Sequence, residues 1–507
     1  MKLNLGCGTD IRPGYINVDA IKGRGVDVVC DITQKLPFEN NSIEEIVAQD
    51  ILEHLTREQL IFTLGEISRV LNISGKLFVR VPNVDAIFDK FADDSETRNL
   101  YLYGNTSNTG VWGSHKVGLT SKEFKIMCRM NKLELVSETT VDTNFKFELI
   151  KTNQKLKLQK ILFINQTLGI GGAETFNIGL FNWLKKQNIE ILTYTTNDRF
   201  NKMLGDGQKI PVVLDIIGNW RGLIKAILLL PFGLWHYLKL FYLNFDVIYM
   251  SGFPEKIIIT PIAKLLNKPV VWVEFGPLES VFNKFFGLPK LLYRFVSWMP
   301  DIVIMPTQHT YKANSAITHV PAHKVRIIPC AIEGFRHRNT KAQKHLVICV
   351  SRLEKGKGQD LLIEAWPRVL ERFPDAKLRI IGEGDLKLKP CKNVEIVGYV
   401  KDAVSEIAKA SVLVFPSVWP LEGFGLVMLE AMSQNVPVVA YDRGTAPEII
   451  DDSCGILVND LAEGIIKMLE HPTKGGVKRF GENFTFDIIG PKYLEVFKYA
   501  YSAHSTI

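Results

Sequence analysis

The chain has 507 residues, of which 46% are apolar and 23% charged, so it is too apolar for a disordered protein and too long for one small module. The net charge of +7 is mild for this length and does not by itself indicate a nucleic-acid-binding protein. The seven cysteines include no CxxC pair, which disfavours a zinc ribbon or a disulfide framework and favours a reducing compartment. No basic segment followed by a long apolar one opens the chain, so we expect no cleaved signal peptide.

Apolar strand-like runs alternate with amphipathic stretches of helix length over almost the whole chain. This alternation is typical of α/β proteins with parallel sheets. A short apolar strand, a glycine-containing turn and a helix follow one another from Lys2, from Lys160 and again from His345. Polar, basic stretches at 151–160 and 337–344 separate these three units. We therefore predict three α/β domains, and their bounds are residues 1–152, 158–340 and 341–507.

The first predicted domain opens with a short apolar strand that runs into Gly6, Cys7 and Gly8. Glycines at this point let the backbone pass close to a ligand, because no Cβ stands in the way. A second predicted strand ends in Asp19, and a third is followed by Asp31. A carboxylate at the tip of the second strand of such a sheet can accept both hydrogens of a ribose diol. The pattern predicts a nucleotide-type site at the carboxyl ends of these strands.

Together with the later motifs Leu-Pro-Phe and Leu-Glu-His-Leu, these features resemble the class I S-adenosylmethionine-dependent methyltransferases over about residues 1–150. The resemblance implies that the glycine turn lies beneath the methionine part of S-adenosylmethionine, that Asp19 holds the ribose hydroxyls and that Asp31 holds the adenine amino group. Because the first predicted strand starts at residue 2, we expect no counterpart of the helix that usually precedes this sheet. A base assists methyl transfer to a hydroxyl, and Glu53, His54 and His115 are the candidates. The alternative for His54 is a packing role, and for the whole domain an inactive fold.

The second predicted domain begins with an apolar strand at 161–165 and a turn that contains Gly171 and Gly172, and a helix is predicted from Thr175 to Lys186. A glycine turn that opens a helix offers free amides and the positive end of the helix dipole to a phosphate or a sugar oxygen. The turn is not a Walker loop, because no Gly-Lys-Ser/Thr follows. It is therefore a candidate for binding a phosphate or a sugar oxygen.

Two stretches of this domain, 221–242 and 282–298, mix aromatic and basic residues. Such a surface suits anionic lipid, with apolar side chains in the interface and cations at the head groups. The alternative is a buried helix with a solvated basic edge. The most apolar run, from Ala226 to Trp235, is interrupted by Pro231 and is predicted to be too short to span a bilayer.

In the third predicted domain, Arg352 and Lys357 lie between a strand at 346–350 and a helix at 360–373. Two cations in such a turn can hold a diphosphate and stabilise the charge that it gains as a leaving group. The guanidinium does so as a two-pronged fork and the ammonium as a point charge. The turn is thus a candidate for binding a diphosphate.

Two glutamates eight residues apart, Glu422 and Glu430, flank the segment Gly423, Phe424 and Gly425. A helix that began near Gly423 would place Glu430 two turns inside it. One carboxylate could then take a sugar hydroxyl and the other the ribose diol, while the helix-start amides approach the phosphates.

The GGAE turn at 171–174, the two cations, the glutamate pair and a later Pro447-Glu448 resemble the retaining GT-B glycosyltransferases of family 4 over about residues 158–507. The resemblance implies two facing Rossmann-like domains, a nucleotide sugar in the cleft between them and a final helix that crosses back to the second domain. It assigns the ribose to Glu430 and the transferred sugar to Glu422. It places the base near Tyr399 and Val400.

Two positions depart from that family's pattern. Glu274 and Phe275 stand where the family often has a histidine, so Glu274 is the candidate for polarising the sugar. Pro-Cys-Ala at 329–331 replaces the usual Pro-Asn-Gly turn. The chain contains no Asp-x-Asp, which disfavours a metal-dependent GT-A enzyme, and no metal is expected.

These expectations describe a bifunctional transferase. The larger part would move a hexose from a nucleoside diphosphate sugar, with retention of configuration, to a growing glycan or a lipid-linked oligosaccharide, and the first domain would methylate a sugar hydroxyl. The expected location is the cytoplasm, or the inner face of the plasma membrane as a peripheral protein, with no nucleic acid as partner. The alternatives are a glycosyltransferase with an inactive methyltransferase-like appendage, a non-catalytic nucleotide-sugar-binding scaffold in polysaccharide assembly, and a phosphorylase or sugar epimerase.

Overall fold

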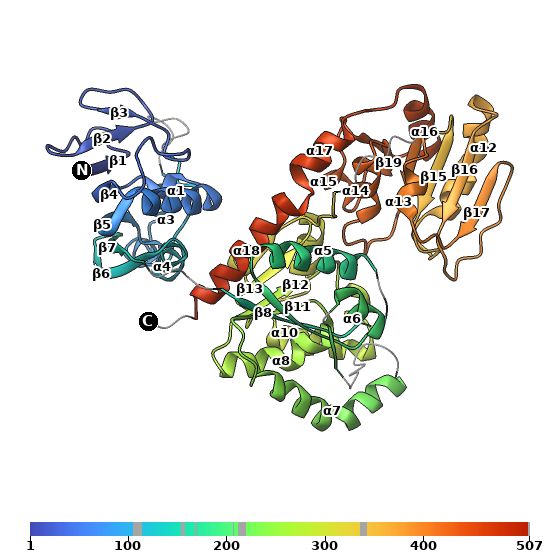
Figure 1. Cartoon of the computed structure of the whole chain (residues 1–507), viewed down its shortest axis with the longest axis horizontal. Coiled ribbons are helices and arrows are strands. Elements are labelled where there is room, and N and C mark those ends of the chain that lie inside the picture. The colour runs from blue at the N-terminus through green and yellow to red at the C-terminus, as the bar shows by residue number, and fades with distance from the viewer. Residues whose placement is uncertain are drawn as a thin grey trace. The chain divides into compact units, whose positions relative to one another are not determined.

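The computed structural model describes residues 1–104, 114–153, 158–167, 169, 171–205, 207–210, 220–334 and 342–504 (Figure 1). Its internal contacts divide the chain into two compact units, one of residues 1–157 and 505–507 and one of residues 158–504. The predicted linkers at 151–160 and 337–344 lie partly outside the described residues. The three predicted domain bounds therefore stay predictions.

The first unit is built on one seven-stranded sheet in the order β3-β2-β1-β4-β5-β7-β6. The strands from β3 to β5 are parallel, whereas β7 pairs antiparallel with both β5 and β6. Leu5 pairs with Val18, so the ends of β1 and β2 lie side by side. The strands are β1 (Lys2–Leu5), β2 (Ile16–Asp19), β3 (Val28–Val29), β4 (Ile43–Gln49), β5 (Leu71–Pro82), β6 (Leu133–Val141) and β7 (Asn144–Lys151). The helices are η1 (Leu52–His54), α1 (Arg57–Val70), α2 (Val84–Lys90), α3 (Ser95–Tyr103) and α4 (Ser121–Met130).

The second unit contains two parallel sheets. The first has the order β10-β9-β8-β11-β12-β13-β14, and its central strands are buried along their length, as expected for parallel strands covered on both faces. Its strands are β8 (Lys160–Asn165), β9 (Glu190–Thr195), β10 (Gln208–Lys209), β11 (Val247–Met250), β12 (Val270–Val273), β13 (Ile302–Met305) and β14 (Val325–Ile327). Its helices are α5 (Gly172–Lys186), α6 (Asp198–Leu204), α7 (Trp220–Leu240), α8 (Phe253–Leu265), α9 (Glu279–Phe282), η3 (Phe285–Gly287), α10 (Leu288–Val296), α11 (Gln308–Ser315) and η4 (Ala322–Lys324).

The second sheet of this unit has the order β17-β16-β15-β18-β19-β20. Its strands are β15 (Leu346–Val350), β16 (Lys377–Ile381), β17 (Val394–Gly398), β18 (Val412–Phe415), β19 (Val438–Tyr441) and β20 (Gly455–Val458). The helices are α12 (Gln359–Arg372), α13 (Ala403–Ile407), α14 (Leu426–Ser433), α15 (Ala446–Ile449), α16 (Leu461–Glu470), α17 (Gly476–Asn483) and α18 (Phe486–Ser502). We call the part of the unit built on the β8–β14 sheet the first lobe and the part built on the β15–β20 sheet the second lobe.

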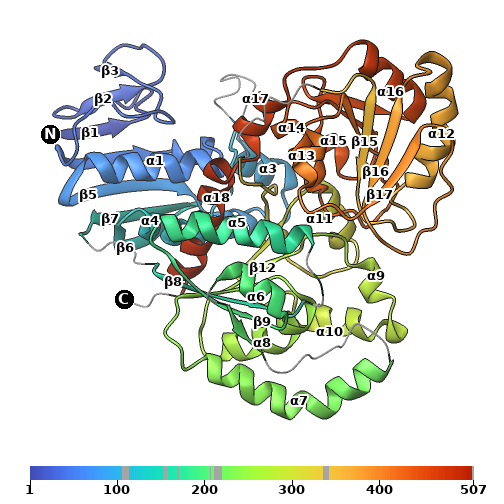
Figure 2. The ribbon, with the colours of Figure 1, turned by 45° about the vertical axis from the view of Figure 1, so that its right-hand side comes forward.

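The last helix, α18, follows the second lobe in sequence but packs on α5 of the first lobe (Figures 1 and 2). Two glycines make this close crossing feasible. A Cβ on Gly179 of α5 would lie 2.1 Å from the ring of Phe486, and a Cβ on Gly490 of α18 would lie 2.4 Å from the indole of Trp183. One hydrophobic core therefore runs from the first lobe through α18 into the second.

Helix α5 begins at Gly172, three residues before the predicted start at Thr175. Gly171 is its N-cap, and the Glu174 carboxylate accepts a hydrogen bond of 2.8 Å from the Gly171 amide. This side-chain cap satisfies one of the amides that a helix start leaves unpaired, which explains the earlier start.

Candidate functional site

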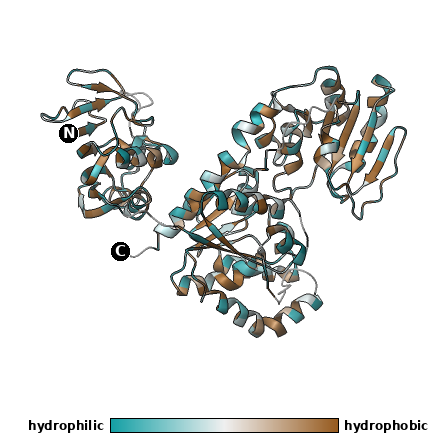
Figure 3. Ribbon diagram, in the orientation of Figure 1, coloured by the Kyte–Doolittle hydropathy of each residue, from teal (hydrophilic) through white to brown (hydrophobic). Residues whose placement is uncertain are grey.

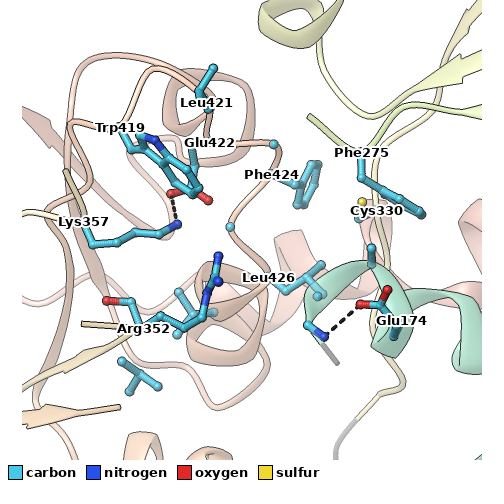
Figure 4. Close-up of a pocket in the computed structure, with 18 of the residues that line it drawn as sticks. Glu174, Phe275, Cys330, Arg352, Lys357, Trp419, Leu421, Glu422, Phe424 and Leu426 are labelled. Atoms are coloured by element: carbon cyan, nitrogen blue, oxygen red, sulfur yellow. Dashed lines mark hydrogen bonds and ion pairs between the residues drawn. The ribbon is translucent and has the colours of Figure 1, made fainter. Parts of the chain in front are cut away.

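A cavity of ≈ 540 Å³ lies between the two lobes of the second unit (Figure 4). The turn before α5 forms one wall, the turn between β15 and α12 a second, and the loop between β18 and α14 a third. All three follow the carboxyl end of a parallel strand, which is where ligands bind in doubly wound sheets. The lining includes the predicted residues Gly171, Gly172, Arg352, Lys357, Glu422, Gly423, Phe424 and Gly425.

The first-lobe wall is the N-terminus of α5. A Cβ on Gly172 would lie 3.3 Å from the Leu426 side chain of the second lobe, so the two lobes approach closely here. Helix α5 has 15 residues, and its positive dipole end lies at the cavity. Glu174, which caps α5, also lines the cavity.

The turn between β15 and α12 carries both predicted cations. Lys357 is only 9% exposed, and its ammonium donates to the Glu422 carboxylate at 2.8 Å and lies 4.4 Å from the centre of the Trp419 ring. Arg352 is exposed and pairs with Glu354 at 2.8 Å, and its guanidinium extends into the cavity (Figure 4). Both side chains thus line the same cavity, and both can face an anion bound there.

Gly358 ends this turn with a φ of +78°, a left-handed conformation that favours glycine. A Cβ there would lie 1.9 Å from the carbonyl oxygen of Pro416, just after β18. Glycine therefore lets the turn that carries Lys357 press against the loop that carries Glu422.

Glu422 lies in the loop that precedes α14. Besides Lys357, its carboxylate accepts a hydrogen bond of 2.8 Å from the Ser417 hydroxyl. A Cβ on Gly423 would lie 1.8 Å from the carbonyl oxygen of Phe275, so this loop touches the first lobe. The carboxylate is therefore held in place from both the turn and its own loop.

Helix α14 begins at Leu426 rather than near Gly423, because Gly425 adopts a φ of +90° and interrupts the helix. Glu430 is consequently about one turn inside the helix and not two. It does not line the cavity, and burial raises the pKa of its carboxyl to about 7. Glu430, the predicted ribose ligand, therefore lies apart from the ion pair of Glu422 with Lys357.

Glu274 does not line the cavity either. It is 4% exposed, its carboxylate lies 2.8 Å from the Lys256 ammonium, and it accepts a hydrogen bond of 2.8 Å from the Tyr293 hydroxyl. The next residue, Phe275, reaches the cavity wall instead. The geometry thus favours a structural role for Glu274 and disfavours the catalytic role that the sequence suggested.

The two residues predicted to lie near the base follow β17. Tyr399 is 61% exposed, and Val400 packs against the shared core of the unit. Neither is part of the cavity lining.

Sequence reasoning did not single out Trp419 and Thr167, which line the cavity, or Ser417, which donates a hydrogen bond to Glu422. Ser417 lines the neighbouring cavity, beyond Glu422. The position of Trp419 one turn before Glu422, in the loop after an apolar strand, is the only sequence signal that could have pointed to it. Cys330 and Phe275 were noticed only as departures from a family pattern, and both line the wall opposite Lys357 (Figure 4).

Glu448, at the end of the Pro-Glu motif, joins the two lobes. Its carboxylate accepts hydrogen bonds from the backbone amides of Gln308 at 2.6 Å and His309 at 2.7 Å, at the N-terminus of α11 in the first lobe. A carboxylate at a helix N-terminus is stabilised by the unpaired amides and by the dipole. This contact sets the position of the second lobe next to the cavity.

In the first unit, the turn after β1 has the predicted geometry of a close backbone approach. Gly6 and Gly8 have φ values of +63° and +48°, and a Cβ on Gly8 would meet no atom within 4 Å. The Asp19 carboxylate accepts hydrogen bonds from the amides of Gly8 at 2.8 Å and Ile21 at 2.9 Å. The turn and the end of β2 thus form one open polar edge, which fits a ribose and its neighbouring groups.

The other predicted cofactor residues lie around that edge. Cys7 is buried, and its amide donates to the Val18 carbonyl at 3.1 Å. Asp31 is exposed, and its carboxylate accepts from the Thr33 amide at 2.8 Å. The Cys30 amide donates to the Asp19 carbonyl at 2.8 Å, which keeps the strand end that precedes Asp31 close to Asp19.

The three candidate bases, Glu53, His54 and His115, come together in the first unit. One ligand-type atom from each lies within 4.8 Å of the others. Burial raises the pKa of the Glu53 carboxyl to about 8 and, with the neighbouring His54, lowers the pKa of His115. The segment between His54 and His115 includes 105–113, which lies outside the described residues.

The two aromatic and basic stretches of the first lobe meet at its surface. Trp220 of α7 stacks edge-on against Phe285 of η3, with ring centres 4.9 Å apart. Apolar residues (brown) recur along α7 (Figure 3), and many are exposed. The exposed apolar residues of α7 and of 286–298 are Trp220, Ile224, Ile227, Leu228, Leu230, Phe232, Trp235, Leu238, Phe286, Leu288, Leu291, Phe295 and Trp298.

The helix that contains the apolar run, α7, is longer than the run itself. It has 21 residues, because flanking residues such as Arg221 and Lys225 continue the helix rather than end it. The prediction that this segment is too short to span a bilayer was therefore wrong. By length and composition alone it is the one helix among the described residues that could cross a membrane.

The fold and the sites define two classes of protein in one chain. A doubly wound sheet with an antiparallel β7 carries the glycine turn and acidic strand ends of a class I methyltransferase. Two facing doubly wound lobes with a cavity between them form a GT-B fold.

Comparison with protein families agrees with this division. Residues 4–79 match the model of a methyltransferase domain, residues 170–333 that of Glycosyltransferase Family 4 and residues 344–471 that of glycosyl transferases group 1. The predicted resemblance to a fusion of these families, and the predicted fold class, are confirmed.

Among known proteins, an uncharacterised glycosyltransferase of Methanocaldococcus jannaschii is 30% identical over 218 residues, which cover 38% of this chain and 53% of that protein. A GDP-mannose-dependent monoacylated alpha-(1-6)-phosphatidylinositol monomannoside mannosyltransferase of Corynebacterium glutamicum is 34% identical over 148 residues, which cover 25% of this chain and 39% of that protein. The chain therefore spans about half or less of the length of these relatives. The crystal structure of HepE from Anabaena in complex with UDP superposes with a TM-score of 0.54 at 19% identity, over 66% of this chain and 99% of HepE, a likeness of fold.

Proposed function

We propose that the second unit transfers a hexose from a nucleoside diphosphate sugar to a glycan or a lipid-linked acceptor, with retention of configuration. The observation that carries this proposal is the single cavity shared by Arg352, Lys357 and Glu422. Two cations beside a helix N-terminus suit a diphosphate, and the carboxylate next to Lys357 suits sugar hydroxyls. The matches to family 4 and group 1 models support the same class of reaction.

The proposed step is a front-face displacement. The bond between the anomeric carbon and the diphosphate oxygen breaks, the acceptor oxygen bonds to the same face, and a diphosphate oxygen takes the acceptor's proton. Arg352 and Lys357 would stabilise the charge that the diphosphate gains. Glu422, held by Lys357 and Ser417, would orient the sugar through its hydroxyls.

A transfer assay tests this proposal. The full chain is incubated with labelled UDP- and GDP-hexoses and a membrane extract as the acceptor source. We expect label in a lipid-linked or polymeric product, release of the nucleoside diphosphate, and an anomeric configuration in the product that matches the donor, as measured by NMR. Donor binding without any transfer would instead indicate the non-catalytic scaffold.

We further propose that the first unit binds S-adenosylmethionine and methylates a sugar hydroxyl. The open position of Gly8 in the turn after β1 and the adjacent Asp19 carboxylate support this proposal. When bound, S-adenosylmethionine supplies an electrophilic methyl group. The chain's own residues would hold the ribose at Asp19 and the adenine at Asp31, and would accept the acceptor's proton at the cluster of Glu53, His54 and His115.

Replacing Asp19 with asparagine is expected to weaken S-adenosylmethionine binding about 10–100-fold, because a hydrogen-bonded carboxylate contributes roughly 1.5–3 kcal/mol. Calorimetric titration of the full chain measures the affinity. The exposed Asp93, changed to asparagine, is the matched control and should bind like the wild type. No heat from the wild type would favour an inactive appendage.

We also propose that the exposed face of α7 and 286–298 docks on anionic lipid at the inner face of the plasma membrane. Its apolar side chains are accompanied by basic residues on the same two segments, and the name of the Corynebacterium relative includes a phosphatidylinositol acceptor. Docking would bring the cavity of the second unit to a lipid-linked acceptor.

Replacing Leu228, which is 75% exposed on α7, with glutamate is expected to lower binding to phosphatidylglycerol-containing vesicles about tenfold. Co-sedimentation of the full chain with vesicles measures the bound fraction. The same change at Ile21, an exposed residue of the first unit, should have no effect. Equal binding to neutral and anionic vesicles would contradict the electrostatic part of the proposal.

A further inference from the structure

We infer that Glu53, His54 and His115 form a binding site for one divalent transition-metal ion. Two imidazoles and one carboxylate are a donor set that suits ions from Mn²⁺ to Zn²⁺ rather than Ca²⁺ or Mg²⁺. This inference departs from the expectation that the chain needs no metal. It concerns the first unit and is independent of the sugar-transfer cavity.

The geometry of the cluster is close to that of a metal site. One atom from each residue lies within 4.8 Å of the other two, and the imidazole rings meet edge to face with centres 5.0 Å apart. Ligand atoms at roughly 2.0–2.2 Å from one ion lie about 3–3.5 Å from each other. Small side-chain rotations would therefore complete the site.

Two of the three candidate ligand groups are buried polar atoms without a hydrogen-bond partner. Glu53 is 3% exposed, and its Oε2 atom is buried with no hydrogen-bond partner, as is the Nδ1 atom of His115. Both residues line a small cavity of ≈ 10 Å³. A cavity of this size holds about one water-sized sphere, so it suits a single ion or water. Buried polar atoms are almost always paired, which points to an occupant here.

The backbone holds the histidines in place for this role. The Nδ1 atom of His54 lies 3.1 Å from the Ser114 carbonyl oxygen, to which it can only donate, so its Nε2 atom keeps a free lone pair. The amides of Lys116 and Val117 donate to the Glu53 carbonyl at 2.8 and 3.3 Å. The segment that carries His115 is thus fastened to the residue that carries the carboxylate.

The position of the cluster suggests what the ion would do. Ile51, two residues before Glu53, packs against the glycine turn, since a Cβ on Gly6 would lie 2.4 Å from it. If the proposed methyl transfer is correct, an ion here would polarise the acceptor hydroxyl and favour its deprotonation, and the three side chains would then act as its ligands in place of the direct proton acceptor. Ion binding itself does not depend on that proposal.

Titration of the metal-stripped full chain with Co²⁺, followed by visible absorption, tests the site, and Zn²⁺ is then added as a competitor. We expect one equivalent of Co²⁺ to give a ligand-field spectrum that Zn²⁺ abolishes. Loss of a residue that only hydrogen-bonds to a metal ligand typically weakens metal binding about 10–100-fold. Glu53→Gln and His115→Ala each remove a ligand itself and should weaken Co²⁺ binding by more than that. The exposed His471, changed to alanine, is the matched control and should keep the full signal.

Thermal melting separates this result from a folding defect. Glu53→Gln keeps the size of the side chain, and burial already favours the neutral form of the Glu53 carboxyl by raising its pKa to about 8. The metal-free variant should therefore melt no lower than the wild type, while the rise in melting temperature caused by Co²⁺ should disappear. Equal Co²⁺ binding by the wild type, Glu53→Gln and His115→Ala would overturn the inference. It would also be overturned if the wild type did not bind one equivalent of Co²⁺ specifically. Calorimetry with S-adenosylmethionine on the metal-free protein reports separately on the proposed methyltransferase.

Discussion

Replacing Lys357 with methionine is expected to lower kcat/KM for sugar transfer by about 10²–10³-fold, the usual cost of removing one preorganised group that stabilises a transition-state charge. Methionine keeps much of the buried aliphatic stem but removes the ammonium that lies 2.8 Å from Glu422. The variant therefore loses the point charge for the diphosphate. It also leaves the Glu422 carboxylate with the hydrogen bond from the Ser417 hydroxyl but without its ion pair.

Lys355 offers a matched control for this experiment. It lies two residues earlier in the same turn, is exposed and does not line the cavity. Lys355→Met should keep transfer within about twofold of the wild type, since an isolated exposed charge contributes little. Initial rates with the labelled donor measure both variants. If Lys357→Met transferred as fast as Lys355→Met, the ammonium would have no part in the reaction.

Replacing Gly358 with alanine is expected to lower the free energy of unfolding of the second unit by about 2–5 kcal/mol. The left-handed φ of +78° costs roughly 1–2 kcal/mol for a residue with a Cβ. The new Cβ would also lie 1.9 Å from the Pro416 carbonyl oxygen, and forcing such an overlap apart costs about 1–3 kcal/mol more. Backbone atoms cannot rotate away as a flexible side chain could.

Gly398→Ala separates the two contributions. Gly398 has a φ of +80°, but a Cβ there would meet no atom within 4 Å. It should lose only the 1–2 kcal/mol of backbone strain. Urea unfolding followed by tryptophan fluorescence measures both variants, because all tryptophans except Trp112 lie in the second unit. If the two variants lost the same free energy of unfolding, the overlap with the Pro416 carbonyl oxygen would add nothing to the destabilisation of Gly358→Ala.

The strand-turn-helix units were predictable because their signals are local. Gly6 and Gly8, like Arg352 and Lys357, follow an apolar strand directly, and the carboxyl ends of parallel strands converge on one edge of a sheet. Any polar residue at such an end has a strong chance of facing a ligand. For the same reason the sequence predicted a ligand-binding position for Glu422, in the loop after β18, and Glu422 lines the cavity.

The residues that were misplaced lie where a local pattern cannot decide. Glu430 was expected two turns into a helix, but a single left-handed glycine at 425 delays the start of α14. Glu274 ends a strand at the correct edge, yet Lys256 and Tyr293, which lie on two other helices, capture its carboxylate. Trp419 is a loop residue whose contact with Lys357 depends on how two loops meet.

The amino-acid sequence by itself determined the α/β class, the positions of the glycine turns and which cations and acids end the strands, because backbone conformation and strand burial depend on neighbouring residues. Only the tertiary structure decided which of those side chains share a cavity and which are neutralised inside a lobe. It alone brought His115 to Glu53 and His54, since contacts between residues about 60 positions apart depend on the packing of the whole sheet.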